Sequence, residues 1–344
     1  MIGSLLSAAA TGFSVQVAHF IGANDLVKAR QVYRHALICG VAFSLLVTLI
    51  GVGIHSHLPY WLGGGEDIAP NSSRYFLIYS LVLPFVFLYH ISEMMLKSAG
   101  NMHTPSIMAV LICLCDVAFN YLFIYIMKMG VVGAAMGTAL AYISISLPNL
   151  YLSAFRNRLL NFRQDRVPFR WVEEYVRHAC KISIPIAIQN ILMSGAQIVS
   201  TMIVAPLGNI AIAAHSFAIT AESLCYMPGY GIGDAASTLV GQTHGAGRVD
   251  LCKNFAYMTV GLGMAVMAVM GVVMYVFAPE MIGVLSPVES IRELGTICLR
   301  IEAFAEPFFA ASIVTYCVCV GAGDTRKPAM INLGTMWLVR LTLA

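Results

Sequence analysis

The stretch Ala235-Ala-Ser-Thr-Leu-Val-Gly-Gln-Thr-His-Gly-Ala-Gly247 decides the fold of this chain, because a second version of it lies near the N-terminus. That version reads Val15-Gln-Val-Ala-His-Phe-Ile-Gly-Ala-Asn24, and the pairs Gly22-Ala23 and Gly245-Ala246 lie 223 residues apart. In both, an apolar segment runs into small residues and charged residues follow directly. We interpret each as the end of a membrane helix on the same side of the bilayer.

The composition indicates an integral membrane protein. Of the 344 residues, 59% are hydrophobic and only 11% are charged, whereas soluble domains carry about 25% charged residues. Too few polar side chains remain to cover a water-facing surface. The net charge of +3 gives no reason to expect a nucleic-acid partner. We therefore expect a multi-pass protein of the cytoplasmic membrane, with the lipid bilayer as its surroundings.

Ten apolar segments are long enough to cross, or to begin to cross, a hydrocarbon core about 30 Å thick. They are residues 3–21, 34–54, 75–97, 105–127, 130–155, 182–206, 210–240, 254–278, 298–320 and a last one from 329. The turn Pro206–Asn209 separates two of them. We expect polar loops at 66–74 and 156–178, the second with a short surface helix around Trp171–His178.

The loops between these segments alternate in charge. Fifteen of the twenty Lys and Arg residues lie in every second loop, and seven of these fall between Arg156 and Lys181. Basic residues favour the cytoplasmic side. The alternation therefore supports the number of segments and places the Gly22 and Gly245 ends in the cytoplasm.

The 223-residue offset recurs along the chain and predicts two lobes. It also relates Gly40 to Gly263, Pro84 to Pro307, Gly100 to Gly323 and Pro105 to Pro328. One period holds six spans, so both copies share one orientation, which is a parallel six-plus-six repeat around a central cavity. The repeat predicts a lobe at 1–156, a cytoplasmic loop at 157–180 and a lobe at 181–344, with the first and last helices of the plan missing.

Several motifs, in order, resemble those of the multidrug and toxic compound extrusion (MATE) transporters. They are Gly100-Asn-Met-His-Thr-Pro105, Gly130-Val-Val-Gly-Ala-Ala-Met-Gly-Thr-Ala139, Ala221-Glu-Ser-Leu-Cys-Tyr-Met-Pro228, Gln242-Thr-His-Gly-Ala-Gly-Arg248, Gly321-Ala-Gly-Asp-Thr-Arg-Lys-Pro328 and Trp337-Leu-Val-Arg-Leu341. The resemblance covers nearly the whole chain, from the second helix to part of the eleventh of twelve.

This resemblance implies a monomeric antiporter that exports amphipathic, often cationic drugs or metabolites in exchange for H⁺ or Na⁺. It implies no catalytic residue, no metal and no cofactor beyond the coupling ion. The motif residues at helix ends are assigned to packing and gating, since glycine permits sharp turns and close helix contact. They are Gly22, Gly100, Pro105, Gln242, Gly245, Gly247, Gly323 and Pro328.

Acidic residues inside membrane segments are costly and therefore need a reason. Glu302 and Glu306 are four residues apart, which puts both on one face of a helix over 298–320. Two carboxylates in apolar surroundings should share a proton. We predict a cation-coupling site from Glu302, Glu306 and Glu222, with Asp116 as a further candidate one helical turn before Asn120. Structural hydrogen bonds between helices are the competing interpretation.

Uncharged polar and soft side chains are candidates for the wall of the substrate cavity. They are Asn120, Gln189, Asn190, Met193, Gln197 and Tyr226. Aromatic and thioether groups suit promiscuous binding of cations, although a Met or aromatic stripe is more often plain packing. Glu93 precedes Lys97 by four residues, so we expect a local ion pair there.

The coupling ion stays open because the family's ion-binding acids do not all carry over. Some Na⁺-coupled members have a Glu about eight residues after the proline of the 182–206 segment, and Met193 stands there. Other members have an acidic residue about twelve residues before the first Gly of the Gly-Ala-Gly-Asp-Thr motif. In this sequence that position is Phe309, about one turn after Glu306.

Two other function classes compete with an antiporter. A flippase for lipid-linked saccharides has a similar repeat, but it should show a more basic cavity than these acidic and neutral residues provide. A membrane-embedded transferase needs a cluster of His and acidic residues at an interface. His55 and His57 with Glu66 and Asp67 come nearest to one, without metal-ligand spacing.

Overall fold

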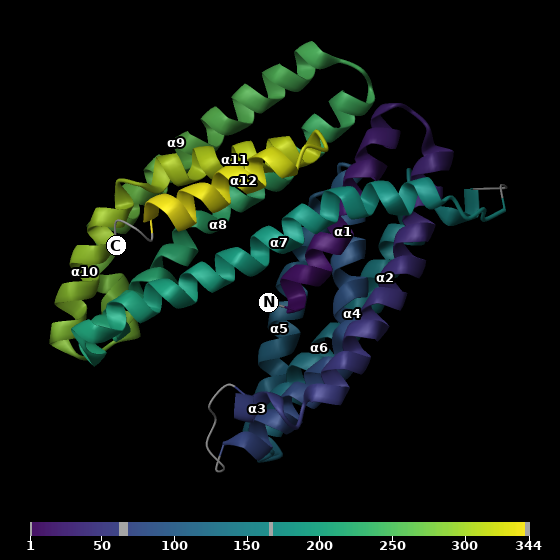
Figure 1. The fold of residues 1–344 in the computed structure, drawn as a ribbon. Helices are drawn as coiled ribbons and strands as arrows, with labels where there is room; N and C mark the ends of the chain where they lie inside the picture. The colour runs from purple at the N-terminus through teal and green to yellow at the C-terminus, as the bar shows by residue number, and fades with distance from the viewer. Residues whose placement is uncertain (1, 62–67, 165–167, 341–344) are drawn as a thin grey trace. The chain divides into compact units, whose positions relative to one another are not determined.

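The computed structural model describes residues 2–61, 68–164 and 168–340, and these form helices joined mostly by short turns, with a longer polar segment between Arg156 and Glu173 (Figure 1). The helices are α1 (Ile2–Gly22), α2 (Leu26–Ile54), α3 (Leu58–Trp61), α4 (Ala69–Ser98), α5 (His103–Tyr121), α6 (Gly130–Tyr151), α7 (Glu173–Val204), α8 (Asn209–Gly245), α9 (Val249–Leu285), α10 (Glu289–Ala303), α11 (Glu306–Gly321) and α12 (Arg326–Gly334). Wider π turns extend α5 through Leu122–Ile126, α6 through Leu152–Arg156 and α12 through Thr335–Arg340.

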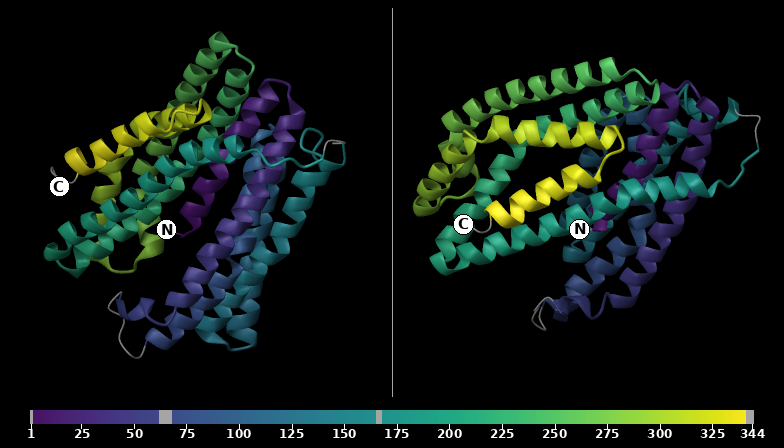
Figure 2. Two further views of the ribbon diagram at one scale, coloured as in Figure 1. Left: turned by 45° about the vertical axis from the view of Figure 1, so that its right-hand side comes forward. Right: turned by 45° about the horizontal axis from the view of Figure 1, so that its top comes forward.

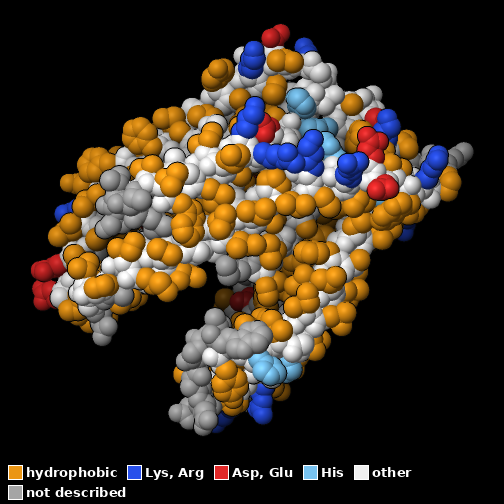
Figure 3. Space-filling model, viewed as in Figure 1, with side chains coloured by type: hydrophobic (Ala, Val, Ile, Leu, Met, Phe, Trp, Pro, Cys, Tyr) orange, Lys and Arg blue, Asp and Glu red, His pale blue; other side chains and the backbone are white. Residues whose placement is uncertain are grey.

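Eight of the described helices are long and apolar enough to cross a bilayer, and the bent pair α10–α11 makes a ninth span if counted as one. Hydrophobic side chains cover most of the visible surface (Figure 3). Because lipid is as apolar as these side chains, such a surface is stable in a membrane. The all-helical membrane fold expected from the composition is confirmed.

The chain divides into two compact units, residues 2–184 and 185–344. In the first, α4 contacts α1, α2 and α6, around a core that includes Tyr33, Phe87 and Met95. In the second, α8 and α9 contact each other and both contact α10 and α11, around a core that includes Met274 and Leu299. The packed helices of each unit can be followed by colour in Figure 2.

Four helices of the two units end in the same way. The residues Asn24, Gly100, Gly247 and Gly323, after α1, α4, α8 and α11, have φ angles of 59°, 80°, 69° and 86°. In each case the next amide donates to a carbonyl five residues back, as Arg248 N does to Thr243 O at 3.0 Å and Asp25 N to Phe20 O at 2.9 Å. This left-handed ending satisfies carbonyls that the helix leaves over.

The 223-residue offset relates these ends residue by residue. Gly22 and Gly245 are the last residues of α1 and α8, and Pro105 and Pro328 are the third residues of α5 and α12. Proline is tolerated there because the N–H groups of a helix's first turn have no acceptor within the helix, so no hydrogen bond is lost. Gln242 supplies the carbonyl that accepts from Ala246 N at 3.0 Å. The motif residues therefore shape helix ends, and their assignment to gating stays a prediction.

The first copy adds a charged cap that the second lacks. The Asp25 carboxylate accepts from the Lys28 amide at 3.1 Å and pairs with its ammonium at 2.9 Å. Partial burial works toward a higher pKa for Asp25, but the hydrogen bonds and charge of Lys28 outweigh it and lower that pKa below its usual value. Arg248 stands at the equivalent place before α9.

The polar segment after α6 is held against the start of α2. Arg30 Nε donates to Leu159 O at 2.9 Å, and Gln31 Nε2 donates to Pro168 O at 3.2 Å. The buried His35 bridges Gln31 O at 2.7 Å and the amide of Val172 at 2.9 Å. These bonds attach residues of the expected 157–180 loop to the first unit.

Three expected boundaries are wrong. The separate surface helix around Trp171–His178 does not form, because Glu173 begins α7 and the helix continues without a break into the apolar part. The expected loop at 66–74 ends earlier, since α4 begins at Ala69. The single span over 298–320 is two helices bent by 58°. The turn at Pro206–Asn209 is confirmed, since α7 ends at Val204 and α8 begins at Asn209.

We predict that the substitution Gly247→Ala lowers the free energy of unfolding by about 1 kcal/mol, the cost of forcing an L side chain into a left-handed conformation. The measurement is the thermal unfolding midpoint in lipid nanodiscs. Gly261→Ala is the matched control, because Gly261 lies inside α9 with nothing within 4 Å of the new methyl group. A loss as large for Gly261→Ala as for Gly247→Ala contradicts this assignment.

Candidate functional site

The buried carboxylate of Glu306 lies where the bent span of the second unit, α10–α11, breaks. Glu306 is the first residue of α11, its side chain is 1% exposed, and neither carboxylate oxygen has a hydrogen-bond partner. A buried polar group without a partner costs free energy and calls for an explanation. Glu306 is thus the most unusual ionisable group among the described residues.

The expected placement of Glu302 and Glu306 on one helical face is wrong. Glu302 is the next-to-last residue of α10, and the tight turn Phe304–Ala305 separates that helix from α11. In that turn Ala305 N donates to Glu302 O at 2.8 Å, and Phe304 N donates to Ile301 O at 3.3 Å. Pro307 contributes to the break because it has no N–H for the carbonyl of Ala303.

Three carboxylates nevertheless come together in this region. Glu222 of α8 and Glu302 both lie close enough to Glu306 to act on it electrostatically. Cys225, buried at 2% exposure, and Tyr226 lie one turn along α8 and face the same two charges of Glu222 and Glu306. Like charges that act on one another favour sharing a proton or binding a cation.

Tyr226 also stacks edge-on against Tyr230, with ring centroids 5.7 Å apart. The pair brings aromatic surface next to the carboxylates, a combination that suits organic cations. Sequence reasoning named Glu222 and Tyr226 but missed Cys225, although its position three residues after Glu222 indicates the same helical face.

In the first unit, Asp116 and Asn120 of α5 face α6. A β-carbon on Gly137 of α6 would collide with the Asn120 side chain, so Gly137 leaves the room that Asn120 occupies. Asp116 acts electrostatically on Tyr142 of α6. One side-chain oxygen of each, Oδ1, is buried without a hydrogen-bond partner. The pair is half-buried on the α6-facing side of α5, and its role as cation or substrate ligands stays a prediction.

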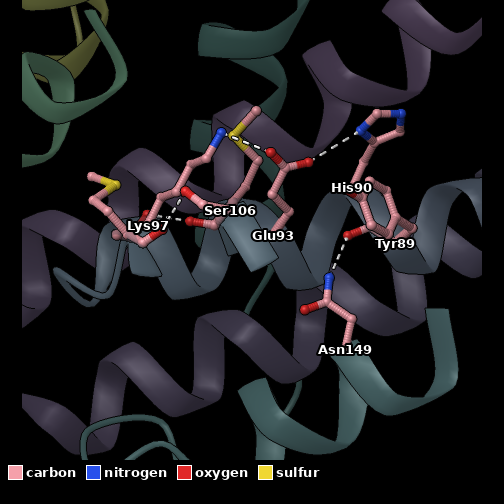
Figure 4. A network of polar contacts seen from close by, with 9 residues as sticks. Tyr89, His90, Glu93, Lys97, Ser106 and Asn149 are labelled. Atoms are coloured by element: carbon pink, nitrogen blue, oxygen red, sulfur yellow. Dashed lines mark hydrogen bonds and ion pairs between the residues drawn. The ribbon is translucent and has the colours of Figure 1, made fainter. Parts of the chain in front are cut away.

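A separate polar network lies in the C-terminal part of α4 (Figure 4). Glu93 pairs with Lys97 at 2.7 Å, as expected from their spacing, and His90 Nδ1 lies 3.7 Å from the second oxygen of Glu93. Asn149 of α6 donates to the backbone oxygen of Tyr89 at 3.3 Å. The sequence offered no signal for Asn149, since its partner is a backbone atom 60 residues away.

The polar residues expected to line one side of α7 have different surroundings. Gln189 is 7% exposed, and its side-chain oxygen is buried without a partner. Asn190 and Met193 are half-buried, whereas Gln197 is exposed. A shared cavity wall for these four residues stays a prediction.

The described residues include no group of three or more His, Cys, Asp and Glu side chains that could hold a metal ion. His55 Nδ1 lies 2.6 Å from the backbone oxygen of Val52. Its expected companions Glu66 and Asp67 lie outside the described residues.

The chain is similar to a large group of transporters. The family model MatE matches residues 1–122 and 185–344. A "Probable multidrug resistance protein NorM" of Thermotoga maritima is 26% identical over 348 residues, which cover 99% of this chain and 74% of the relative. A "Multidrug export protein MepA" of Staphylococcus saprophyticus is 22% identical over 290 residues, 84% of this chain and 64% of that protein.

Solved structures show the same fold. "MATE in complex with MaD3S" matches with a TM-score of 0.92 and 19% identity, over 99% of this chain and 76% of that chain. A structure described as the "outward-facing conformation of a multidrug resistance MATE family transporter of the MOP superfamily" matches with a TM-score of 0.89 and 20% identity, over the same shares of the two chains. The expected two-lobe fold is confirmed.

We predict that the substitution Lys97→Met lowers the thermal unfolding midpoint, because it leaves the Glu93 charge without its close cation. Breaking a fully buried ion pair from one side costs about 3 kcal/mol or more, and this partly exposed pair should cost less. The double variant Glu93→Gln with Lys97→Met removes both charges and should recover most of the loss. Equal midpoints for the single and double variants contradict a stabilising pair.

Proposed function

Since the chain belongs to the MatE family of transporters, we propose that it is a secondary antiporter that exports amphipathic or cationic small molecules in exchange for H⁺ or Na⁺. Family membership makes it a membrane transporter and not an enzyme. Relatives are named for multidrug resistance and multidrug export, and one structural neighbour was solved in complex with MaD3S. These names support a small-molecule substrate.

The observation that carries the proposal is the state of Glu306. Its carboxylate is buried, both oxygens lack a hydrogen-bond partner, and the charges that act on it belong to Glu222 and Glu302. An ionised carboxylate in such a place is stable only with a bound cation, and a neutral one only with a proton. The group therefore suits the uptake of one positive charge from an external gradient.

The proposed cycle couples this uptake to export by alternating access. Substrate enters from the cytoplasm while Glu306 lacks its cation. The aromatic surface of Tyr226, with the carboxylate of Glu222 nearby, favours a cationic substrate. An external H⁺ or Na⁺ then neutralises the acidic group, which weakens the attraction for the substrate and releases it outward. Either cation meets the electrostatic requirement, so the ion is decided by experiment.

The test uses the protein in proteoliposomes loaded with a fluorescent cationic drug. Efflux is measured under an imposed pH gradient and, separately, under an imposed Na⁺ gradient. The gradient that accelerates efflux identifies the coupling ion. Efflux that responds to neither gradient contradicts antiport.

We predict that Glu306→Gln reduces gradient-driven efflux by about tenfold or more, a loss that corresponds to only about 1.4 kcal/mol of lost cation interaction. The substitution conserves size and removes the charge. Glu222→Gln should also lower the rate. Glu289→Gln is the matched control, since Glu289 is exposed at the start of α10. Unchanged driven efflux in both Glu306→Gln and Glu222→Gln overturns the assignment of these acids.

A further inference from the structure

The two units contain equivalent prolines, but the helix breaks at only one of them. Pro84 lies inside the continuous helix α4, and Pro307, 223 residues later, lies just after the 58° bend between α10 and α11. Because the sequence position in the repeat is the same, proline alone does not decide whether the helix breaks.

The backbone carbonyl one turn before each proline has a different neighbouring residue in the two units, and only one of these residues can donate a hydrogen bond to it. Proline cannot donate to it, so in a membrane another group must replace the missing donor. In the first unit the hydroxyl of Thr48 on α2 donates to Ser80 O at 3.0 Å in a buried contact. The donor comes from the neighbouring helix, and α4 continues through Pro84.

In the second unit the equivalent of Thr48 is Gly271 on α9, and the equivalent of Ser80 is Ala303. These two residues are again in contact, since a β-carbon built on Gly271 would lie 2.7 Å from Ala303 O. Gly271 has no side chain that could donate to this carbonyl. The same interhelical contact thus provides a donor in one unit and only space in the other.

The space at Gly271 also receives Glu306. The same β-carbon would lie 3.3 Å from Cβ and 3.6 Å from Cγ of Glu306. The equivalent of Glu306 in the first unit is Leu83, which is fully buried and has no polar group to place. The bend therefore occurs in the unit that has a carboxylate at this position.

We propose that Gly271 is a positioning residue for Glu306: by withholding the donor that Thr48 provides in the other lobe, it makes the helix bend at Ala303, and it leaves the room in which Glu306 sits. The bend and the position of the Glu306 carboxylate then both follow from the missing side chain at Gly271. The transport consequence rests on the proposed function, whereas the structural consequence can be tested without transport.

The structural test measures distances between spin labels in a cysteine-free version of the protein in nanodiscs. One pair of labels, at Ile297 and Thr315, flanks the bend, and a second pair, at Arg74 and Leu88, flanks Pro84 in α4. Both Gly271→Ser and Gly271→Ala place a β-carbon 2.7 Å from Ala303 O and must displace it slightly, but only Gly271→Ser also supplies a hydroxyl donor. Gly271→Ala is therefore the matched control, and the first distance should be longer in Gly271→Ser than in Gly271→Ala as the span straightens.

The reciprocal substitution Thr48→Val removes the donor at nearly constant size. It should shorten or broaden the Arg74–Leu88 distance, which is about 21 Å in a straight helix. Thr48→Val decides the question alone if Gly271→Ser does not fold. An unchanged distance in either folded variant overturns the proposal. A third variant, Glu306→Leu, removes the carboxylate, and the proposal also fails if the span straightens in Glu306→Leu but not in Gly271→Ser.

The transport readout is the concentration of the driving cation at half-maximal efflux. Gly271→Ser should raise it, as should the conservative variant Glu306→Asp, while passive leak and protein yield stay unchanged. An unchanged value for Gly271→Ser, with a straightened span, shows that the bend does not position Glu306. Absence of all ion-driven efflux in the parent protein contradicts the proposed function instead, and the distances still decide the role of Gly271.

Discussion

Every backbone carbonyl and amide within the hydrocarbon needs a partner inside the protein, and the architecture depends on this constraint. It explains the long unbroken helices, of which α8 and α9 have 37 residues each. The last carbonyls of any helix also need donors, and four helices of the two units meet this need with one hydrogen-bond pattern, in which a left-handed residue brings the next amide back to a carbonyl of the last turn. Thr48 meets the same need in the middle of a span.

The candidate site arises where this constraint is relaxed. Equivalent positions of the two repeated units can be compared directly, so where one unit differs, the other serves as an internal reference. At the bend, Leu83 of the first unit is replaced by Glu306, Thr48 by Gly271 and Ser80 by Ala303. Proteins break local rules mainly where function demands it. Three substitutions in one contact, with a buried carboxylate among them, fit that expectation.

Much of the fold could be predicted because its signals are local. The Gly22 and Gly245 motifs mark the last residues of α1 and α8, since a glycine-rich end following an apolar run is readable from a few neighbouring residues. The break at Glu302–Glu306 could not be predicted in this way. Whether a proline interrupts a helix depends on whether a neighbouring helix supplies a donor to the freed carbonyl, as Thr48 does in the first unit and Gly271 does not in the second. The start of α7 was missed for a related reason: a polar first turn resembles a surface helix until its continuation is known.

Glu93 of the first unit and Glu306 of the second differ in how much a bound cation would stabilise them. Glu93 already has the Lys97 ammonium at 2.7 Å and His90 nearby, so its charge is compensated and a further cation would have to displace a bonded partner. The charged groups that act on Glu306 are carboxylates, and each of them makes its ionised form less stable. A cation or proton arriving there removes repulsion and provides the missing partner at once. The free-energy gain on cation binding is therefore larger at Glu306 than at Glu93, which is the physical reason to place ion coupling at Glu306 and structural support at Glu93.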